Sequence, residues 1–355
     1  MIKRNFILLF TLFITFSANA TEIESNRVIV SIKPLHSLVA GVLGDTGEAE
    51  LLVDGVVSPH HMQLKPSQIK SMQAAHIIFY IDDSFETFLA NVFDILSDDV
   101  LKVPMIDNVE LTLLPYRKGK DWEEHDHHHD EHGGDHHADK HDEHDHHADE
   151  HDEHDQHADE HDEHDHHADE HDEHEKHSSY DMDMHVWLDP ENAQKMVALI
   201  ADTLSDVYPE HRDTYKANAQ GLMQKIDRLN VELKTELSPI QDKPFIVFHD
   251  AYQYFEHTYG LNGVGSIVFE GGESLSPVRI KSVREKLQRT GAACIFSEPQ
   301  FPARPIQTIA EGFDIKVSVL DPLGANLPND ENLYFTLLDN LAYNLTECLM
   351  AKNTN

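Results

Sequence analysis

The chain has 355 residues, of which 40% are hydrophobic, and a formal net charge of −38 at pH 7. This length is sufficient for two domains of ordinary size. The charge argues against nucleic acid as a partner, because no basic stripe is present to replace the counterions of the phosphates. Cations are the partners that such a charge favours.

The N-terminus has the features of an export signal. Lys3 and Arg4 precede an apolar stretch at residues 6–16, and small residues lead to Ala20 in the positions that a signal peptidase requires. The stretch is too short for a membrane anchor, which needs about 20 apolar residues. We therefore predict a signal peptide at residues 1–20, with cleavage after Ala20, and an exported protein.

Residues 21–208 form the first predicted lobe, in which strands and helices alternate. The predicted strands are 27–32, 50–53, 76–81 and 101–106, and the predicted helices are 35–43, 67–75 and 85–96. Such alternation is typical of a parallel sheet that is covered by helices on both faces.

Within this lobe, residues 121–179 are built mainly from a ten-residue repeat, HDEHDHHADE. Residues 121–177 hold 21 of the 29 histidines, and 26 acidic residues against two lysines give −24 of the net charge. Almost nothing apolar is present to offset the entropy of ordering, so we predict a disordered loop. Imidazoles beside carboxylates favour the capture of a borderline divalent metal such as zinc. A solubilising acidic spacer is the alternative, but it leaves the histidines unexplained.

The polar segment at residues 209–238 is predicted to be one long helix that joins two lobes. Pro209 suits a first helical position, and apolar residues recur at helical spacing between Tyr215 and Leu233. At about 1.5 Å per residue this helix is about 40 Å long, which limits hinge motion between the lobes. An ordinary surface helix is the alternative, although such helices are usually shorter.

Residues 239–355 form the second predicted lobe and repeat the pattern of the first. The predicted strands are 245–248, 263–269, 293–297 and 316–320, and the predicted helices are 251–259, 277–289, 305–312 and 331–351. The predicted fold class is therefore α/β, with two lobes that each contain a mainly parallel sheet flanked by helices.

The chain has two cysteines, Cys294 and Cys348, which fit an oxidising compartment. A bridge between them would close a loop of about 55 residues and add roughly 4 kcal/mol of stability by the chain-entropy estimate. Two free buried thiols are the alternative.

Three histidines outside the repeat stand where a metal site is expected. His60 comes after the strand at 50–53, His249 ends the apolar run FIVFHD, and His185 lies in MDMHVWLDP, where the repeat returns to the folded lobe. Because open parallel sheets place their sites after the carboxyl ends of strands, we expect a tetrahedral zinc site completed by water or a carboxylate. A capping or core role is the alternative for each histidine alone. The histidines predicted to be structural are His36, His76, His211 and His257.

Five segments resemble, in order and spacing, the periplasmic zinc-binding proteins of zinc ABC importers, the ZnuA type. They are GVVSPHHMQLKPSQIKSMQAAHIIFYI, HVWLDPENA, VFHDAYQYFE, CIFSEPQF and LDPLG, and the resemblance covers nearly the whole mature chain. It implies two α/β lobes joined by one long rigid helix, with the metal in the interlobe cleft. It matches His60, His185 and His249 to the family's ligands, and it implies a disulfide between Cys294 and Cys348.

The resemblance leaves the fourth ligand open. Some members have a glutamate just before the first ligand, where this chain has Pro59. Water is our first expectation. Asp321 of LDPLG matches an acidic ligand of related manganese and zinc binders but also suits a turn, and His61 would need a different backbone direction. Related manganese binders tend to have a carboxylate where His249 stands, so a third imidazole favours zinc.

The resemblance implies that the chain captures Zn²⁺ in the periplasm and delivers it to an inner-membrane ABC permease and its ATPase, as a monomer without catalysis. The repeat is then a low-affinity zinc reservoir. A manganese- or iron-binding solute-binding protein is one alternative, and a metal-dependent adhesin or buffer without a permease is another.

An exported zinc hydrolase that uses a metal-bound water is a further alternative. No HExxH-type motif supplies its general base. Asp250 and Glu298 are the nearest candidates for that base, although Asp250 is better interpreted as the N-cap of the helix at 251–259.

Overall fold

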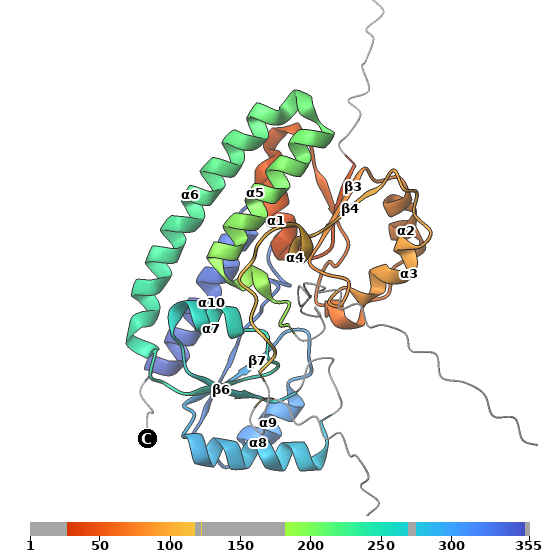
Figure 1. Cartoon of the computed structure of the whole chain (residues 1–355). Coiled ribbons are helices and arrows are strands. Elements are labelled where there is room, and N and C mark those ends of the chain that lie inside the picture. Colours follow the sequence, from red (N-terminus) through yellow and green to blue (C-terminus); the bar gives the residue numbers. More distant parts are fainter. Residues whose placement is uncertain (1–26, 118–121, 123–181, 269–274, 352–355) are drawn as a thin grey trace, which may run out of the picture.

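The computed structural model describes residues 27–117, 122, 182–268 and 275–351 (Figure 1). The predicted signal peptide and almost all of the His-rich repeat lie outside these residues. Within them, the chain forms two four-stranded sheets in which every strand pairing is parallel. The predicted α/β class with two mainly parallel sheets is confirmed.

The first sheet has the strand order β2-β1-β3-β4. Its strands are β1 (Val28–Val30), β2 (Ala49–Leu51), β3 (Ile77–Tyr80) and β4 (Leu101–Pro104). Its helices are α1 (Lys33–Leu43), α2 (Pro66–Gln73), α3 (Ala90–Phe93), α4 (Met105–Asn108) and α5 (Pro190–Val207).

The second sheet repeats this order as β6-β5-β7-β8. Its strands are β5 (Phe245–Val247), β6 (Gly263–Ser266), β7 (Cys294–Ser297) and β8 (Lys316–Val319). Its helices are α7 (Gln253–Tyr259), α8 (Pro277–Thr290), α9 (Arg304–Ala310) and α10 (Leu333–Met350). The disulfide between Cys294 and Cys348 is present and ties β7 to α10.

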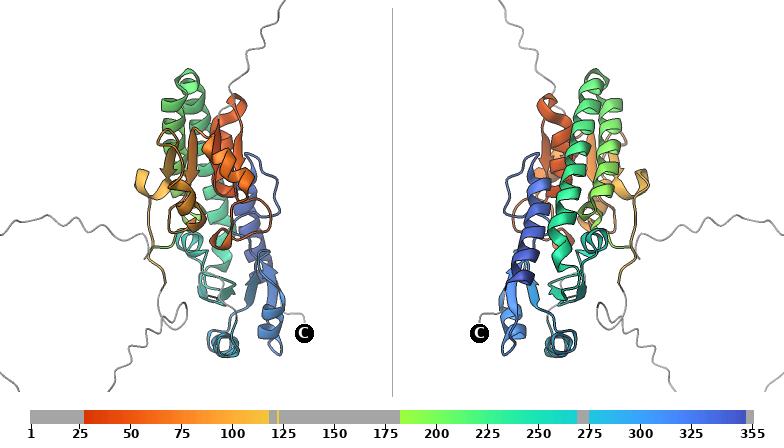
Figure 2. Two further views of the ribbon diagram at one scale, coloured as in Figure 1. Left: turned by 90° about the vertical axis from the view of Figure 1, so that its right-hand side faces the viewer. Right: turned by 90° about the vertical axis from the view of Figure 1, so that its left-hand side faces the viewer.

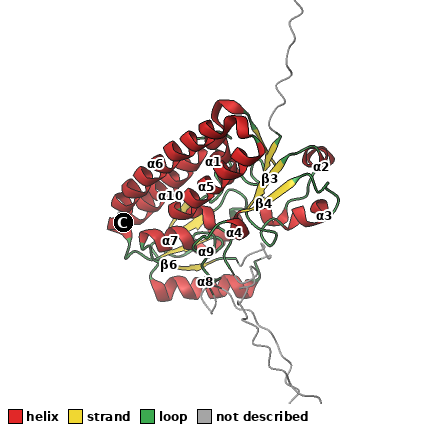
Figure 3. Ribbon diagram, turned by 45° about the horizontal axis from the view of Figure 1, so that its top comes forward, coloured by secondary structure: helices red, strands yellow, loops and turns green. Residues whose placement is uncertain are grey.

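Alternate residues of the two central strands of each sheet enter different parts of the core. In β3, Ile77 and Phe79 join a large cluster that extends to the inner face of the second sheet, whereas Ile78 and Tyr80 join a small outer cluster. The second sheet divides its residues in the same way between the shared cluster and an outer cluster of its own. Helices α1, α5 and α10 lie between the two sheets (Figure 3).

The predicted long helix is also present. Helix α6 (Arg212–Leu237) has 26 residues, or about 39 Å at 1.5 Å per residue, and it follows a 3-10 turn at Pro209–His211. Its buried residues repeat at helical spacing and face the shared core. Figure 2 shows α6 running along the length of the molecule beside α5 and α10.

Polar contacts add to the apolar contact between the halves. The buried ammonium of Lys33 donates to the carbonyl oxygens of Ala325 and Leu327 at 2.9 and 2.8 Å. The indole of Trp187 donates to the carbonyl oxygen of Pro322 at 2.8 Å. These contacts hold the segment after β8 against the first half of the chain, next to the site described below.

Two predictions of helices were wrong in detail. The helix expected at 85–96 is a 3-10 turn followed by the single turn α3, because Phe85 and Glu86 both point into the core at its start. Helix α5 was missed, although Asp189 caps it by accepting from the amide of Glu191, and Pro190 occupies its first turn.

Candidate metal centre

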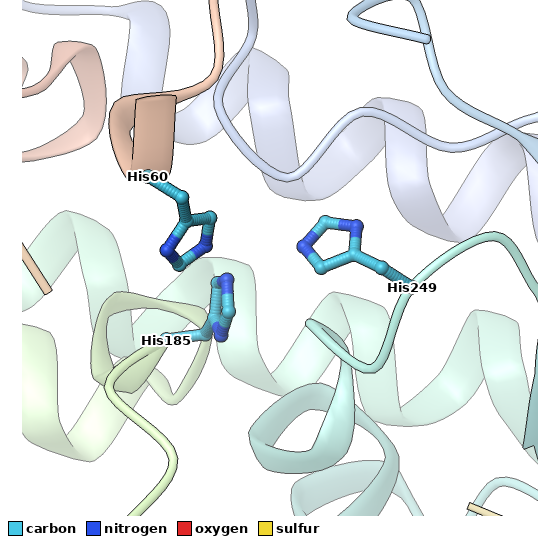
Figure 4. Close-up of side chains that lie close together, drawn as sticks. All are labelled: His60, His185 and His249. Atoms are coloured by element: carbon cyan, nitrogen blue, oxygen red, sulfur yellow. The ribbon is translucent and has the colours of Figure 1, made fainter. Parts of the chain in front are cut away.

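The structure brings together the three histidines that the sequence singled out. His60 lies in a 3-10 turn at Pro59–His61, His185 stands just before the turn Val186–Leu188, and His249 follows β5. One ligand atom from each imidazole lies within 4.8 Å of those of the other two. Figure 4 shows the three rings turned toward a common space. Among the described residues, no Asp, Glu or Cys joins this group.

The imidazole of His185 has a buried carboxylate behind it. Its Nδ1 lies 2.7 Å from Oδ1 of Asp183, which also accepts from the backbone amide of His185. When Nδ1 donates to that oxygen, the tautomer is fixed and the lone pair of Nε2 is free for a metal. Burial holds the pKa of His185 well below its usual value, and His249 nearby lowers it further, so the ring is neutral.

His249 is supported in the same way from a different strand. Its Nδ1 lies 2.7 Å from Oε1 of Glu298, which directly follows β7. Both side chains are buried, and the pairing again directs Nε2 away from the carboxylate. Strands β5 and β7 are neighbours in the sheet, which is why residues 49 positions apart meet here.

His60 is held by packing instead. Its Nε2 is buried and has no hydrogen-bond partner in the structure. The ring lies edge-on to Phe85, with the centroids 4.8 Å apart and the planes at 77°. Burial lowers the pKa of His60 well below its usual value, and the nearby imidazoles of His185 and His249 lower it further. All these features leave a neutral ring with a free lone pair.

The cavity between the rings is small and mostly apolar, with a volume of about 10 Å³. That is room for about one atom of the size of a water oxygen or a metal ion. It is lined by Ser58, Pro59, His60, Phe85, His185, His249, Glu298, Gln300, Phe301, Pro322 and Leu323. Three convergent imidazoles in such a space match the donor set and the size of a zinc site.

Asp321, one candidate for the fourth ligand, is used elsewhere. Its Oδ1 accepts from the amides of Leu323 and Gly324, each at 3.1 Å, and its Oδ2 accepts from the amide of Ala325 at 2.7 Å. The carboxylate therefore stabilises the turn after β8, which was the alternative interpretation of this residue. His61, the other side chain considered, is exposed.

The histidines that were predicted to be structural lie apart from this group. His36 Nε2 contacts the carbonyl oxygen of Ala49 at 2.9 Å, and His76 Nδ1 contacts the hydroxyl of Tyr208 at 2.9 Å. His211 is partly exposed in the 3-10 turn at Pro209–His211, and His257 is exposed on α7.

The prediction that Asp250 caps α7 was wrong. Helix α7 begins at Gln253 with Tyr252 at the N-cap, and the Asp250 carboxylate is paired with Arg117. Arg117 also donates to Glu256 at 2.6 Å. Local sequence pattern does not indicate this pairing, because Arg117 lies 133 residues before Asp250 in the chain.

Comparison with known proteins decides the family. The family model described as zinc-uptake complex component A, periplasmic (ZnuA) matches residues 28–348. The chain belongs to the ZnuA family. Its ZnuA relatives include the high-affinity zinc uptake system protein of Brucella abortus (strain 2308), which is 43% identical over 94% of this chain and 95% of the relative. The protein of that name from Paracoccus denitrificans (strain Pd 1222) is 37% identical over 92% and 93%.

Solved structures agree on the fold. A crystal structure of ZnuA superposes with a TM-score of 0.66 at 22% identity and covers 91% of this chain and 98% of its own. A laminin-binding protein of Streptococcus agalactiae, described as having adhesin and metal-transporting activity, gives 0.64 at 19% identity over 90% and 98%. The resemblance to the ZnuA type is thereby confirmed, as is its two-sheet architecture. The helices of the described ranges include none with the length and apolar character of a membrane span.

The groups that support the ligands were not predicted from the sequence. Asp183 stands two residues before His185, and a carboxylate so close to a ligand histidine is a local signal that could have indicated its role. Glu298 was considered only as a catalytic base, and Phe85 and Gln300 were not considered at all. Their roles depend on contacts between distant parts of the chain.

Proposed function

We propose that this protein captures Zn²⁺ in the periplasm with His60, His185 and His249 and delivers it to an ABC permease driven by an ATPase. The observation that carries the proposal is the convergence of three imidazoles, two of them backed by buried carboxylates, on a space for one small ion. The chain's membership of a zinc-uptake family supports zinc as the ion that is transported. The same proposal includes export, cleavage after Ala20 and a monomer.

In this proposal residues 21–208 and 239–355 are the two lobes that supply the ligands, and residues 209–238 join them. Helix α6 and the shared apolar core limit how far the lobes can separate. In the same proposal the His-rich residues 121–179 act as a weak zinc reservoir, because their repeated imidazoles and carboxylates favour the capture of a borderline divalent metal.

The donor set favours zinc over manganese or iron. Imidazole suits zinc, whereas carboxylate and water oxygens suit manganese. Among the described residues, no acidic side chain joins the three imidazoles. The space of about 10 Å³ between the rings excludes the several waters that an octahedral ion usually retains.

Binding without catalysis fits the same geometry better than hydrolysis does. Asp250 is bound to Arg117, and Glu298 is paired with His249. The cavity of about 10 Å³ has no space for an ester or a phosphate beside the ion. Both candidate bases are therefore already paired with other side chains.

The test is metal analysis of protein that lacks residues 121–179. We expect one tightly bound zinc per chain, and His249→Ala in this background should weaken binding by more than the 10- to 100-fold typical of outer-sphere changes. His257→Ala, on the exposed surface of the same lobe, is the matched control and should change nothing. Unchanged affinity in the His249→Ala protein would refute the site.

A further inference from the structure

The fourth position of the metal shell has no group assigned to it. Zinc bound by three protein ligands usually completes a tetrahedron with water. Apart from the imidazoles, the polar side chains that line the cavity are Ser58, Glu298 and Gln300. Glu298 already supports His249.

Gln300 is oriented by a neighbour that can only accept. Its side-chain Nε2 donates to Oδ1 of Asp321 at 3.0 Å. An ionised carboxylate has no hydrogen to give, so the amide nitrogen must face Asp321 and the amide oxygen must face elsewhere. Asp321 is itself held by three backbone amides, from Leu323, Gly324 and Ala325. The orientation of the Gln300 amide is therefore fixed by the turn after β8.

The amide oxygen of Gln300 has no hydrogen-bond donor. Oε1 of Gln300 is buried and has no hydrogen-bond partner in the structure. Buried amide oxygens almost always have a donor. His185 and His249 cannot supply one, because each directs Nδ1 at a carboxylate and presents the lone pair of Nε2 to the ion. A water molecule on the ion has two hydrogens to donate.

We propose that Gln300 is a positioning residue for the fourth group on the ion: its Oε1 accepts a hydrogen bond from a metal-bound water. This inference rests on the proposed function. A neutral amide oxygen can hold the water without adding a negative charge that would draw harder, oxygen-preferring ions. The Asp321–Gln300 pair thus acts through the water, and it explains why the acidic residue after β8 need not touch the metal.

The test compares Gln300→Met with Gln307→Met in the full mature chain. Methionine keeps the length of the side chain and removes the acceptor, and Gln307 is an exposed glutamine on α9 of the same lobe. Zinc affinity is measured by competition with a chelator. Coordination is measured from the visible spectrum of one molar equivalent of Co²⁺, which reports the number and type of ligands.

We expect Gln300→Met to weaken zinc binding by roughly 10- to 100-fold, to alter the Co²⁺ spectrum, and to leave the melting temperature of the metal-free protein unchanged. Gln307→Met should match the wild type in all three. An unaltered spectrum, or a loss of affinity explained by a lower melting temperature, would overturn the inference. A zinc-loaded structure with Oε1 itself on the ion would also overturn it.

His249→Ala, measured in parallel, distinguishes a failure of the proposed function from a failure of the role proposed for Gln300. If it abolishes tight binding while Gln300→Met behaves as the wild type, the proposed function stands and the role of Gln300 is wrong. If His249→Ala leaves tight binding intact, the proposed function itself fails.

Discussion

The two sides of the metal centre are built on different principles. His185 and His249 each have a buried carboxylate 2.7 Å behind the ring, which fixes the tautomer and makes the imidazole a stronger donor. His60 has no such partner and is oriented by its edge contact with Phe85. Pairing with a carboxylate thus orients two of the ligand rings, and packing against Phe85 orients the third. The loss of a supporting contact should therefore have different consequences on the two sides.

On the His60 side, the largest expected effect is on stability and comes from Glu86. This side chain follows Phe85, is fully buried, and accepts from the hydroxyl of Ser31 at 2.5 Å and from the amides of Ile81 and Asp82. Burial raises the pKa of Glu86 to about 7 from a usual value of 4.5, and the nearby Asp82 adds to this rise.

A raised pKa means that the folded state binds more protons than the unfolded state between these two values. The stability that protonated Glu86 contributes is fully present below about pH 4.5 and is lost as the pH rises through about 7. The free energy of unfolding falls by about 3 kcal/mol over this range. Glu86→Gln should remove this part of the pH dependence. Denaturant unfolding of metal-free protein from pH 5 to pH 8 measures it, and Glu110→Gln, at an exposed position, is the control. Parallel curves for wild type and Glu86→Gln would contradict the prediction.

On the carboxylate side, the expected effect is on affinity. Asp183→Asn and Glu298→Gln should each weaken zinc binding by roughly 10- to 100-fold, because each removes the carboxylate paired with Nδ1 of a ligand histidine. Asp83→Asn, an exposed carboxyl on the turn that carries Phe85, should stay within about twofold, since surface charges are worth little. Chelator competition gives all three values. If Asp83→Asn weakened zinc binding as much as Asp183→Asn does, the proposed difference between the two sides would be wrong.

The smallest effect comes from the aromatic contacts. Phe85→Leu should weaken zinc binding by about fivefold, because an edge-to-face pair contributes roughly 0.5–1.5 kcal/mol. Phe301→Leu is the matched change beside His249, where the centroids are 5.9 Å apart. We expect a smaller effect there, since Glu298 still orients that ring. Equal losses would show that packing orients both rings.

The sequence predicted what depends on local pattern. Alternating elements, the long helix and the three histidines followed from periodicity and from positions after strands. The support of His249 by Glu298 did not, because it requires β5 and β7 to be neighbours. The helix at 85–96 was predicted too long, because the inward position of Glu86 depends on a contact with Ser31, 55 residues earlier. Asp250 has a local cue for a cap, but an ion pair with Arg117 took its place.

The apolar layer that both sheets share bears on cooperativity. Phe79 of the first sheet and Phe296 of the second belong to one buried cluster, so neither sheet can lose its inner helices without exposing the other. Heating should then unfold both halves in a single transition, with equal calorimetric and van't Hoff enthalpies. A ligand that binds only the folded chain raises the midpoint of that transition by mass action. A rise in the melting temperature of the whole molecule therefore reports that the metal ion is bound.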